Sequence, residues 1–240
     1  MPETAEAQAV RPTNLGQRLA TLLQGLGQMA LWTAMLFLSA GTLRWIRGWI
    51  CTATYFTSMT ITGIVIHHCN HDLIQARSKW RRKDTKPFDK VFVAIFMPLT
   101  FVQVAVAGLD AARFRWSHMP FSTIYPGAAI LLIGIGIVTW TMAVNPFAET
   151  TVRIQSDRGH TVISSGPYRF VRHPMYVGSA LMYPATALML GSKWALALAA
   201  LMVSLLIART DLEDRALRRE LNGYDHYASV TRYRLLPGIW

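Results

Sequence analysis

Long stretches without a charged residue constrain the fold of this chain more than any other feature. Six runs contain no Asp, Glu, Lys or Arg, namely 19–43, 48–71, 91–109, 116–148, 173–192 and 194–208, and together they make up more than half of the 240 residues. A water-soluble helix needs a polar face, whereas a helix that crosses a bilayer needs about 20 mostly apolar residues. We therefore expect an all-α, multi-pass transmembrane bundle. A soluble enzyme, a disordered chain and a disulfide-rich scaffold are excluded.

The runs predict six spans, at about 20–42, 49–69, 91–109, 122–144, 174–190 and 193–209. The last run has only 15 residues and reaches ~22 Å, which is short of the ~30 Å hydrocarbon core. Five full spans with a re-entrant hairpin over 174–209 is therefore an alternative. We expect one integral membrane domain over 1–240, in which residues 1–120 supply the N-terminal spans.

The placement of Lys and Arg predicts the orientation. The N-terminus, the loops 70–90 and 145–173 and the tail from Arg209 carry 19 of these residues, against five on the other side. Cytoplasmic loops are enriched in Lys and Arg, so we expect both termini in the cytoplasm, at the inner membrane if the source is bacterial. The net charge of +11 is then a property of these loops, and we expect no nucleic-acid partner.

Residues with catalytic potential gather in two stretches on the predicted cytoplasmic side, 153–178 and 209–240. In the first stretch, Pro174 suits the first turn of a helix. The N-terminus of that helix, flanked by Arg172 and His173, can bind an anionic group such as a carboxylate. A positively charged loop with His173 as an interfacial cap explains the pattern equally well.

In each of two pairs of polar residues, the two members lie four positions apart, which brings both to one helical face. Arg209 and Glu213 follow an apolar segment, where ionisable groups are costly unless they are functional or paired, so they predict either a site or a purely structural ion pair. His67 and His71 have a spacing that metal ligands use. No third ligand is evident for the histidines, and we expect no metal.

Two separated blocks resemble the isoprenylcysteine carboxyl methyltransferase family and the related phospholipid methyltransferases. They read Gly166-Pro-Tyr168-xxx-Arg172-His-Pro-x-Tyr176-x-Gly178 and Arg209-xxx-Glu213-Asp214-xx-Leu217. The closing residues 233–240 and two runs in the first half resemble a bacterial branch. The resemblance implies a methyltransferase-like core over 121–240 of an integral membrane enzyme, whose cofactor is S-adenosylmethionine. Asp214 departs from the family pattern, which often has a second Glu there.

The resemblance also implies roles for individual residues. The connecting loop and the C-terminal helical tail would form the cofactor site, through Gln155, His160, Thr161, Val162, Ile163, Tyr168, His173, Pro174, Met175, Tyr176 and Glu213. Arg209 would bind the methyl acceptor and, with Glu213, form the catalytic pair. Because no dedicated base is evident, the chemistry favours an acceptor that is a carboxylate or an already neutral amine. We expect a lipophilic carboxylate, which a guanidinium can grip through two hydrogen bonds.

Three other functions compete with this interpretation. Phospholipid N-methylation is the nearest, and an NADPH-dependent sterol-type membrane reductase would have a C-terminal half of similar shape. A channel or transporter is disfavoured, because the predicted span interiors carry no charged residue and hence no visible ion path. The expected partners are the lipid bilayer and a lipophilic methyl acceptor, and no protein partner is evident.

Overall fold

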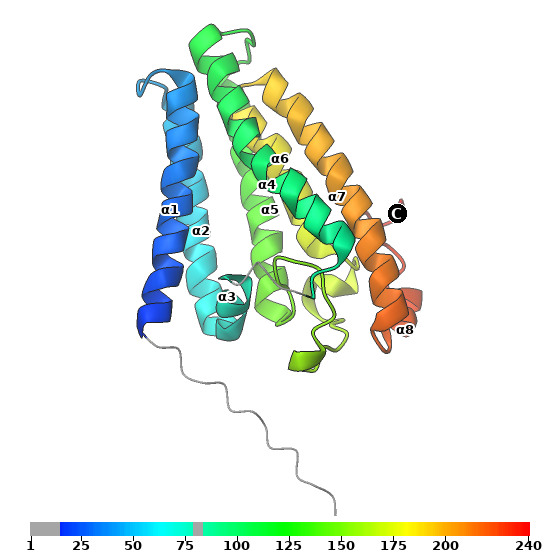
Figure 1. The fold of residues 1–240 in the computed structure, drawn as a ribbon. Helices are drawn as coiled ribbons and strands as arrows, with labels where there is room; N and C mark the ends of the chain where they lie inside the picture. The colour runs from blue at the N-terminus through cyan, green and yellow to red at the C-terminus, as the bar shows by residue number, and fades with distance from the viewer. Residues whose placement is uncertain (1–14, 79–83) are drawn as a thin grey trace, which may run out of the picture.

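The computed structural model describes residues 15–78 and 84–240, and every regular element in these ranges is a helix (Figure 1). The helices are α1 (Leu15–Ala40), α2 (Ile46–Cys69), α3 (His71–Ser78), α4 (Pro87–Ala107), α5 (Ile124–Val144), α6 (Pro174–Leu190), α7 (Lys193–Glu220) and α8 (Tyr224–Val230). A π-helical segment (Gly108–Phe114) continues α4, and 3-10 turns lie at Phe121–Thr123, Ser156–Arg158 and Gly166–Arg169. The predicted all-α bundle is confirmed.

Five helical segments are long and apolar enough to cross a membrane: Leu22–Ala40, Ile46–Cys69, Pro87–Phe114, Phe121–Val144 and Lys193–Glu220. The chain is thus an integral membrane protein. Residues 193–209 belong to a helix of 28 residues that continues to Glu220, so the span that seemed too short is long enough. The short helix is instead α6, which has only 17 residues and spans ~26 Å. The physical reason is that Arg209 ends the apolar run without ending the helix.

The antiparallel pair α5 and α6 is held at close range by two glycines. A Cβ on Gly178 would lie 2.5 Å from the carbonyl oxygen of Gly134, and a Cβ on Gly134 would lie 2.7 Å from that of Gly178. Small residues permit such backbone approach between membrane helices, where dispersion contacts replace the hydrophobic effect. This contact fixes the N-terminal half of α6 against α5.

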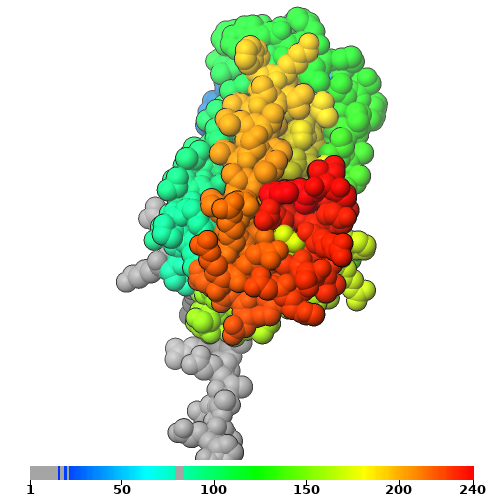
Figure 2. Space-filling view, turned by 90° about the vertical axis from the view of Figure 1, so that its right-hand side faces the viewer, coloured from blue at the N-terminus to red at the C-terminus, as the bar shows by residue number. Residues whose placement is uncertain are grey.

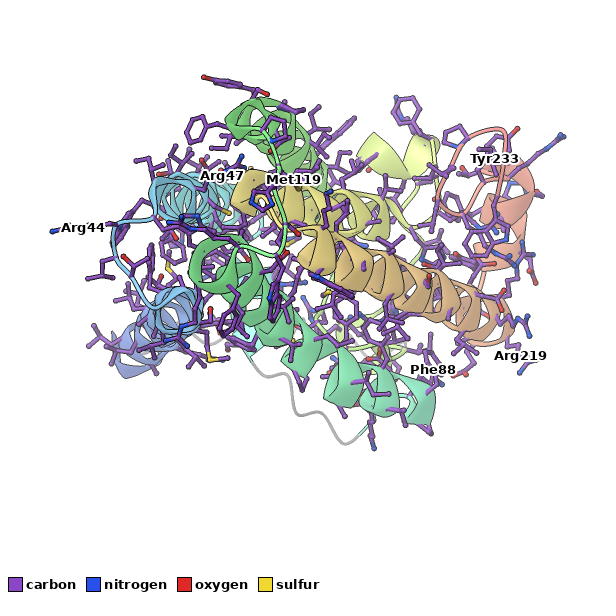
Figure 3. All side chains as sticks on the ribbon, turned by 90° about the horizontal axis from the view of Figure 1, so that it is seen from above. Arg44, Arg47, Phe88, Met119, Arg219 and Tyr233 are labelled. Atoms are coloured by element: carbon purple, nitrogen blue, oxygen red, sulfur yellow. The ribbon has the colours of Figure 1, made fainter. Side chains whose placement is uncertain are left out.

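The two ends of the bundle are built differently. At the upper end in Figure 1, Arg47 donates hydrogen bonds to the carbonyl oxygens of Met119 at 2.9 Å and Met189 at 3.1 Å. Figure 3 shows Arg47 beside Met119, whereas Arg44 points away from the bundle. The lower end holds α3, the segment 145–173 and α8 (Figure 1). Three described segments that were assigned to one side by their charge, 71–78, 145–173 and the tail from Arg209, therefore share one end. Arg11 and residues 79–83 lie outside the described residues. The cytoplasmic orientation of this end stays a prediction, as does the division of the chain at residue 120.

The C-terminal segment, red in Figure 2, folds back beside the lower part of α7. The backbone amides of Arg172 and His173 donate to the carbonyl oxygens of Tyr233 and Arg234, at 2.9 and 3.0 Å. Leu235 packs in the same apolar cluster as residues of α4, α6 and α7. The start of α6 is therefore clamped by the C-terminal segment.

Candidate active site

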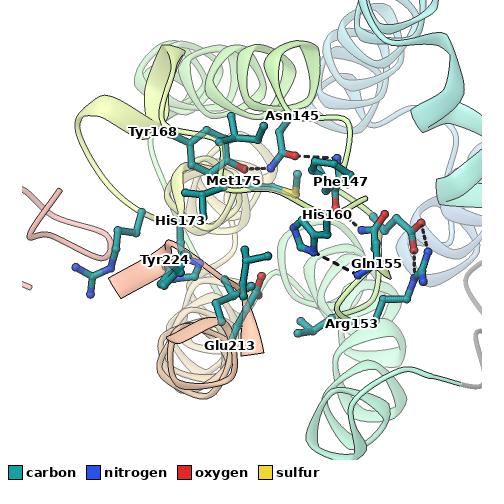
Figure 4. A pocket seen from close by; sticks show the side chains of 18 of the residues that line it. Asn145, Phe147, Arg153, Gln155, His160, Tyr168, His173, Met175, Glu213 and Tyr224 are labelled. Atoms are coloured by element: carbon teal, nitrogen blue, oxygen red, sulfur yellow. Dashed lines mark hydrogen bonds and ion pairs between the residues drawn. The ribbon is translucent and has the colours of Figure 1, made fainter. Parts of the chain in front are cut away.

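The sequence-predicted residues converge on one cavity at the lower end of the bundle. The segment 145–173, the start of α6, the lower part of α7, and α8 contribute its walls (Figure 4). Pro174 does not line the cavity and instead occupies the first turn of α6. The predicted residues that do line it are Gln155, His160, Thr161, Val162, Ile163, Tyr168, His173, Met175, Tyr176, Arg209 and Glu213.

Gln155 holds the loop that forms one wall. Its side-chain amide donates to the carbonyl oxygen of Phe147 at 2.7 Å and accepts from Arg158 at 2.7 Å. Its backbone N–H donates to Nδ1 of His160 at 3.3 Å, and the His160 ring lies 4.5 Å from that of Phe147. Because Gln155 is buried and its amide is satisfied within the protein, its side chain shapes the wall.

Burial lowers the pKa of His160 below its usual 6.5. The imidazole is therefore neutral at pH 7, which leaves Nδ1 available as an acceptor for the Gln155 amide. The neutral ring keeps the turn 155–160 closed, and the turn carries Gly159 in the left-handed conformation that glycine tolerates.

Arg153 anchors the same segment to the bundle. Its guanidinium donates to the carboxylates of Glu149 at 2.9 Å, Asp84 at 2.8 Å and Asp157 at 2.8 Å. The hydrogen bonds to Glu149 are the first cause of a raised Arg153 pKa. The buried Asp89 of α4 adds a further tie, because its Oδ2 accepts from the backbone of Val152 at 2.7 Å.

Arg209 reaches the cavity with its charge already paired. Its Nε lies 2.8 Å from Oδ1 of Asp89, and one terminal nitrogen donates to the carbonyl oxygen of Thr150 at 3.0 Å. The guanidinium sits over the rings of Phe92 and Tyr176, 4.5 and 5.2 Å from their centroids. A cation over an aromatic face is stabilised by the ring quadrupole, so the group is rigidly oriented.

The carboxylate of Glu213 has a different partner from the one considered in the sequence. It accepts a short hydrogen bond from the hydroxyl of Tyr176. The alternative prediction, a purely structural ion pair between Arg209 and Glu213, is therefore wrong, since Arg209 pairs with Asp89. Sequence reasoning missed Asp89 because its partner lies 120 positions away in the chain. Its signal in the sequence was an acid one residue before a long apolar run, within the run 84–90 that resembles the bacterial branch.

Asp214, the neighbour of Glu213, is fully buried and forms the centre of a cluster of ion pairs and hydrogen bonds. Its partners are Arg172 at 2.7 and 3.1 Å, Tyr224 at 2.9 Å, Arg234 at 3.0 Å, His173 at 3.3 Å and Arg218 at 3.3 Å. The Arg172 side chain thus turns into this cluster. The His173 ring stacks on that of Tyr176 at 5.8 Å, which links the cluster to the cavity.

Several lining residues escaped the sequence analysis. Asn145 donates to the hydroxyl of Tyr168 at 2.6 Å, and Tyr227 donates to the Tyr168 carbonyl oxygen at 2.7 Å. Burial raises the pKa of the Tyr168 phenol, so it stays protonated. Tyr224 also lines the cavity. The available signal was position, since Asn145 directly follows the end of α5.

The histidines at the end of α2 lie apart from this cavity. The rings of His67 and His71 are 4.8 Å apart. Within the described residues, however, no group of three or more His, Cys, Asp or Glu side chains is placed to hold a metal ion. Both histidines line a second, larger cavity higher in the bundle.

Comparison with known proteins points to one family. Residues 122–222 match the family model described as phospholipid methyltransferase. The match runs from the start of α5 to just beyond α7 and includes every residue predicted for the site. Comparison of the chain with curated proteins gives no match.

Proposed function

We propose that the lower cavity binds S-adenosylmethionine beside a lipophilic carboxylate acceptor. The match of residues 122–222 to the phospholipid methyltransferase family supports a membrane methyltransferase. The observation that carries the proposal is the convergence of the loop 155–163, Tyr176, Arg209 and Glu213 on one cavity. All of these residues lie within the family match. Asp89, the ion-pair partner of Arg209, lies outside it.

The chemistry of the lining suits the cofactor. Aromatic and aliphatic side chains from the loop and from α7, including Phe147, Val162 and Leu217, can pack against an adenine ring. The carboxylate of Glu213 accepts hydrogen bonds and so suits hydroxyl or ammonium donors. The N-terminus of α6, which His173 leaves without a side-chain cap, favours a carboxylate because of its exposed amides and helix dipole.

The bound cofactor supplies an electrophilic methyl group, so the protein has mainly to align the reactants and exclude water. Holding two reactants in line is worth several kcal/mol of the barrier, up to about 7–11 in favourable cases. Arg209 is held in place by Asp89, Thr150 and two rings. In this orientation it can bind an acceptor carboxylate whose oxygen forms the new O–CH3 bond, without the loss of a proton.

The family description favours a second candidate acceptor, the amine of a phospholipid head group. Methylation of an ammonium group first requires loss of a proton. The cavity offers few groups for that step, because Glu213 already accepts from Tyr176 and His160 accepts from Gln155. This shortage of proton acceptors favours a carboxylate over an amine as the methyl acceptor.

Binding calorimetry on the purified protein in nanodiscs tests the cofactor. We expect S-adenosylmethionine to bind with micromolar affinity, on the order typical of enzyme ligands, and NADPH to give no heat. Binding of NADPH alone would replace the proposal with a membrane reductase. Absence of binding by both would remove the cofactor from the proposal.

Variants of Arg209 test the division of roles. Arg209→Ala should leave the affinity for S-adenosylmethionine nearly intact and abolish methyl transfer, because its guanidinium is assigned to the acceptor. Arg215→Ala is the matched control on the same helix, since Arg215 is exposed and pairs with Asp211. Loss of cofactor binding in a folded Arg209→Lys variant would contradict this role.

A further inference from the structure

Helix α4 lies outside the family match, which covers residues 122–222, yet it contributes two side chains that hold Arg209. Oδ1 of Asp89 lies 2.8 Å from Nε of Arg209. The ring of Phe92 lies 4.5 Å from the guanidinium carbon. Asp89 and Phe92 are three positions apart, so they share one face of the helix. That face meets the arginine that we assign to the methyl acceptor.

Asp89 also binds the backbone of the cavity wall. Its Oδ2 accepts from the N–H of Val152 at 2.7 Å, and the N–H of Lys86 donates to the Val152 carbonyl oxygen at 3.0 Å. Both polar backbone groups of Val152 are therefore bound by the start of α4. Two residues earlier in the chain, the carbonyl oxygen of Thr150 accepts from Arg209 at 3.0 Å. Asp89, this stretch of the wall and Arg209 thus form a closed ring of contacts.

These contacts leave one edge of the Arg209 guanidinium for a ligand. Arginine has N–H donors on Nε and on both terminal nitrogens. Nε faces Asp89, and Nη2 donates to Thr150. Within the described residues, Nη1 makes no hydrogen bond or ion pair. Arg209 lines the cavity, and parallel N–H groups on the edge formed by the two terminal nitrogens match the two oxygens of a carboxylate.

Burial restrains the guanidinium further. The side chain of Asp89 is fully buried, and that of Arg209 is only 10% exposed. Separating two such charges is costly, because water does not solvate either of them in place. The guanidinium therefore stays beside Asp89, and the position of the carboxylate determines where the free edge of Arg209 lies.

We propose that Asp89 is a positioning residue for methyl transfer, which acts through Arg209 and sets the place of the acceptor relative to the cofactor loop. This inference rests on the proposed function, because it assumes that Arg209 binds the acceptor. It gives a helix outside the family match a part in the reaction. The alignment of two reactants is sensitive to small shifts, and a displacement of about 1 Å can lower the rate about hundredfold.

Two substitutions separate the position of Asp89 from its charge. In Asp89→Asn, the amide oxygen can still accept from the Val152 N–H, while the NH2 group turns towards Arg209 and the counter-charge is lost. In Asp89→Glu, the counter-charge stays and the additional methylene group moves it. Glu220→Gln is the matched control, because it removes a partly exposed acid that joins the same two helices, α4 and α7, through Lys86.

Labelling with phenylglyoxal, followed by mass spectrometry, reports on Arg209 without turnover or cofactor. The reagent attacks the neutral guanidine, a form that an adjacent carboxylate disfavours. With the protein in nanodiscs, we expect Arg209 to be labelled about tenfold faster in Asp89→Asn than in the wild type. Asp89→Glu and Glu220→Gln should keep the wild-type rate. Equal rates in Asp89→Asn and the wild type would overturn the inference.

Transfer of a labelled methyl group from S-adenosylmethionine to oleate, a lipophilic carboxylate, measures the consequence for the reaction. Asp89→Asn should lower kcat about hundredfold and Asp89→Glu about tenfold, because both displace the free edge of Arg209. The dissociation constant of S-adenosylmethionine, measured by calorimetry, should stay at the wild-type value in both variants. Glu220→Gln should match the wild type in kcat and in cofactor affinity.

Two results would overturn the inference at this stage. A wild-type kcat in Asp89→Glu would reduce Asp89 to a counter-charge, and a loss of cofactor affinity as large as the loss of kcat would reduce it to a support of the loop. If Asp89→Asn fails to fold, Asp89→Glu, which keeps the counter-charge, decides the question. Failure of the proposed function is a different result: the wild type then methylates no oleate and the role in transfer falls with it, whereas the labelling of Arg209 still depends on Asp89.

Discussion

Glu213 and Asp214 are adjacent acids on α7 with opposite surroundings. Asp214 is fully buried, and its oxygens bind side chains from the residues just before α6, from α7, from α8 and from the C-terminal segment. Glu213 is half-buried, lines the cavity, and accepts from the single hydroxyl of Tyr176. One residue of helical rotation, about 100°, turns one acid into the protein and the other towards the space that a ligand can occupy.

The difference separates a group that holds the fold from a group that is available for chemistry. A carboxylate surrounded by Arg172 and Arg234 has little capacity left for a ligand, and it neutralises charges that would be costly if unpaired. A carboxylate with one protein partner still has lone pairs to offer. Mutations at the two positions should therefore affect different measurements.

The largest effect is expected for Asp214→Ala. Removing this carboxylate leaves Arg172 buried without its counter-charge, and breaking a buried pair in this way costs about 3–5 kcal/mol. Differential scanning fluorimetry in detergent should show a fall in melting temperature of roughly 10 °C. Asp211→Ala, one turn away and partly exposed, is the control and should stay within about 2 °C. If the melting temperature of Asp214→Ala equals that of the wild type, Asp214 does not stabilise the fold, and the proposed difference between Asp214 and Glu213 fails.

Glu213→Gln should produce the reverse pattern. The amide can still accept from Tyr176, so the melting temperature should change little. The loss of charge should raise the dissociation constant for S-adenosylmethionine about tenfold, since a hydrogen bond to a charged group contributes about 1.5–3 kcal/mol. Titration calorimetry measures this. A wild-type dissociation constant would take Glu213 out of the cofactor site.

The same pair shows what a sequence can reveal and what it cannot. The spans were predictable because the absence of charge is a local property. The lining residues were predicted from the resemblance of two sequence blocks to a known family. The partners of Asp214 come from residues 172, 224 and 234, and that convergence depends on how the tail folds back. Asp89 escaped for a similar reason, since only tertiary packing brings α4 to the loop.

A smaller, pH-dependent effect is expected at His160. Burial lowers its folded-state pKa below the unfolded value of 6.5, so the neutral ring stabilises the closed loop above pH 6.5. That contribution is lost as the pH falls through the folded-state pKa. Cofactor affinity measured from pH 7.5 to 5.5 should therefore weaken on acidification. In His160→Asn, which cannot take up the proton, the profile should be flatter; an equally steep profile would assign the titration to another group.

The smallest effect is expected at the ion pair between Lys86 and Glu220, which joins the start of α4 to the end of α7. Its atoms are only 2.6 Å apart, yet the Glu220 side chain is 44% exposed. Solvent screening and side-chain entropy reduce such pairs to about 0–1 kcal/mol, so Glu220→Gln should shift the melting temperature by no more than about 2 °C. This variant calibrates the Asp214 result, because both remove one carboxylate from α7. A shift as large as that of Asp214→Ala would mean that burial does not separate the two classes of acid, and the contrast between Glu213 and Asp214 would then have to rest on geometry alone.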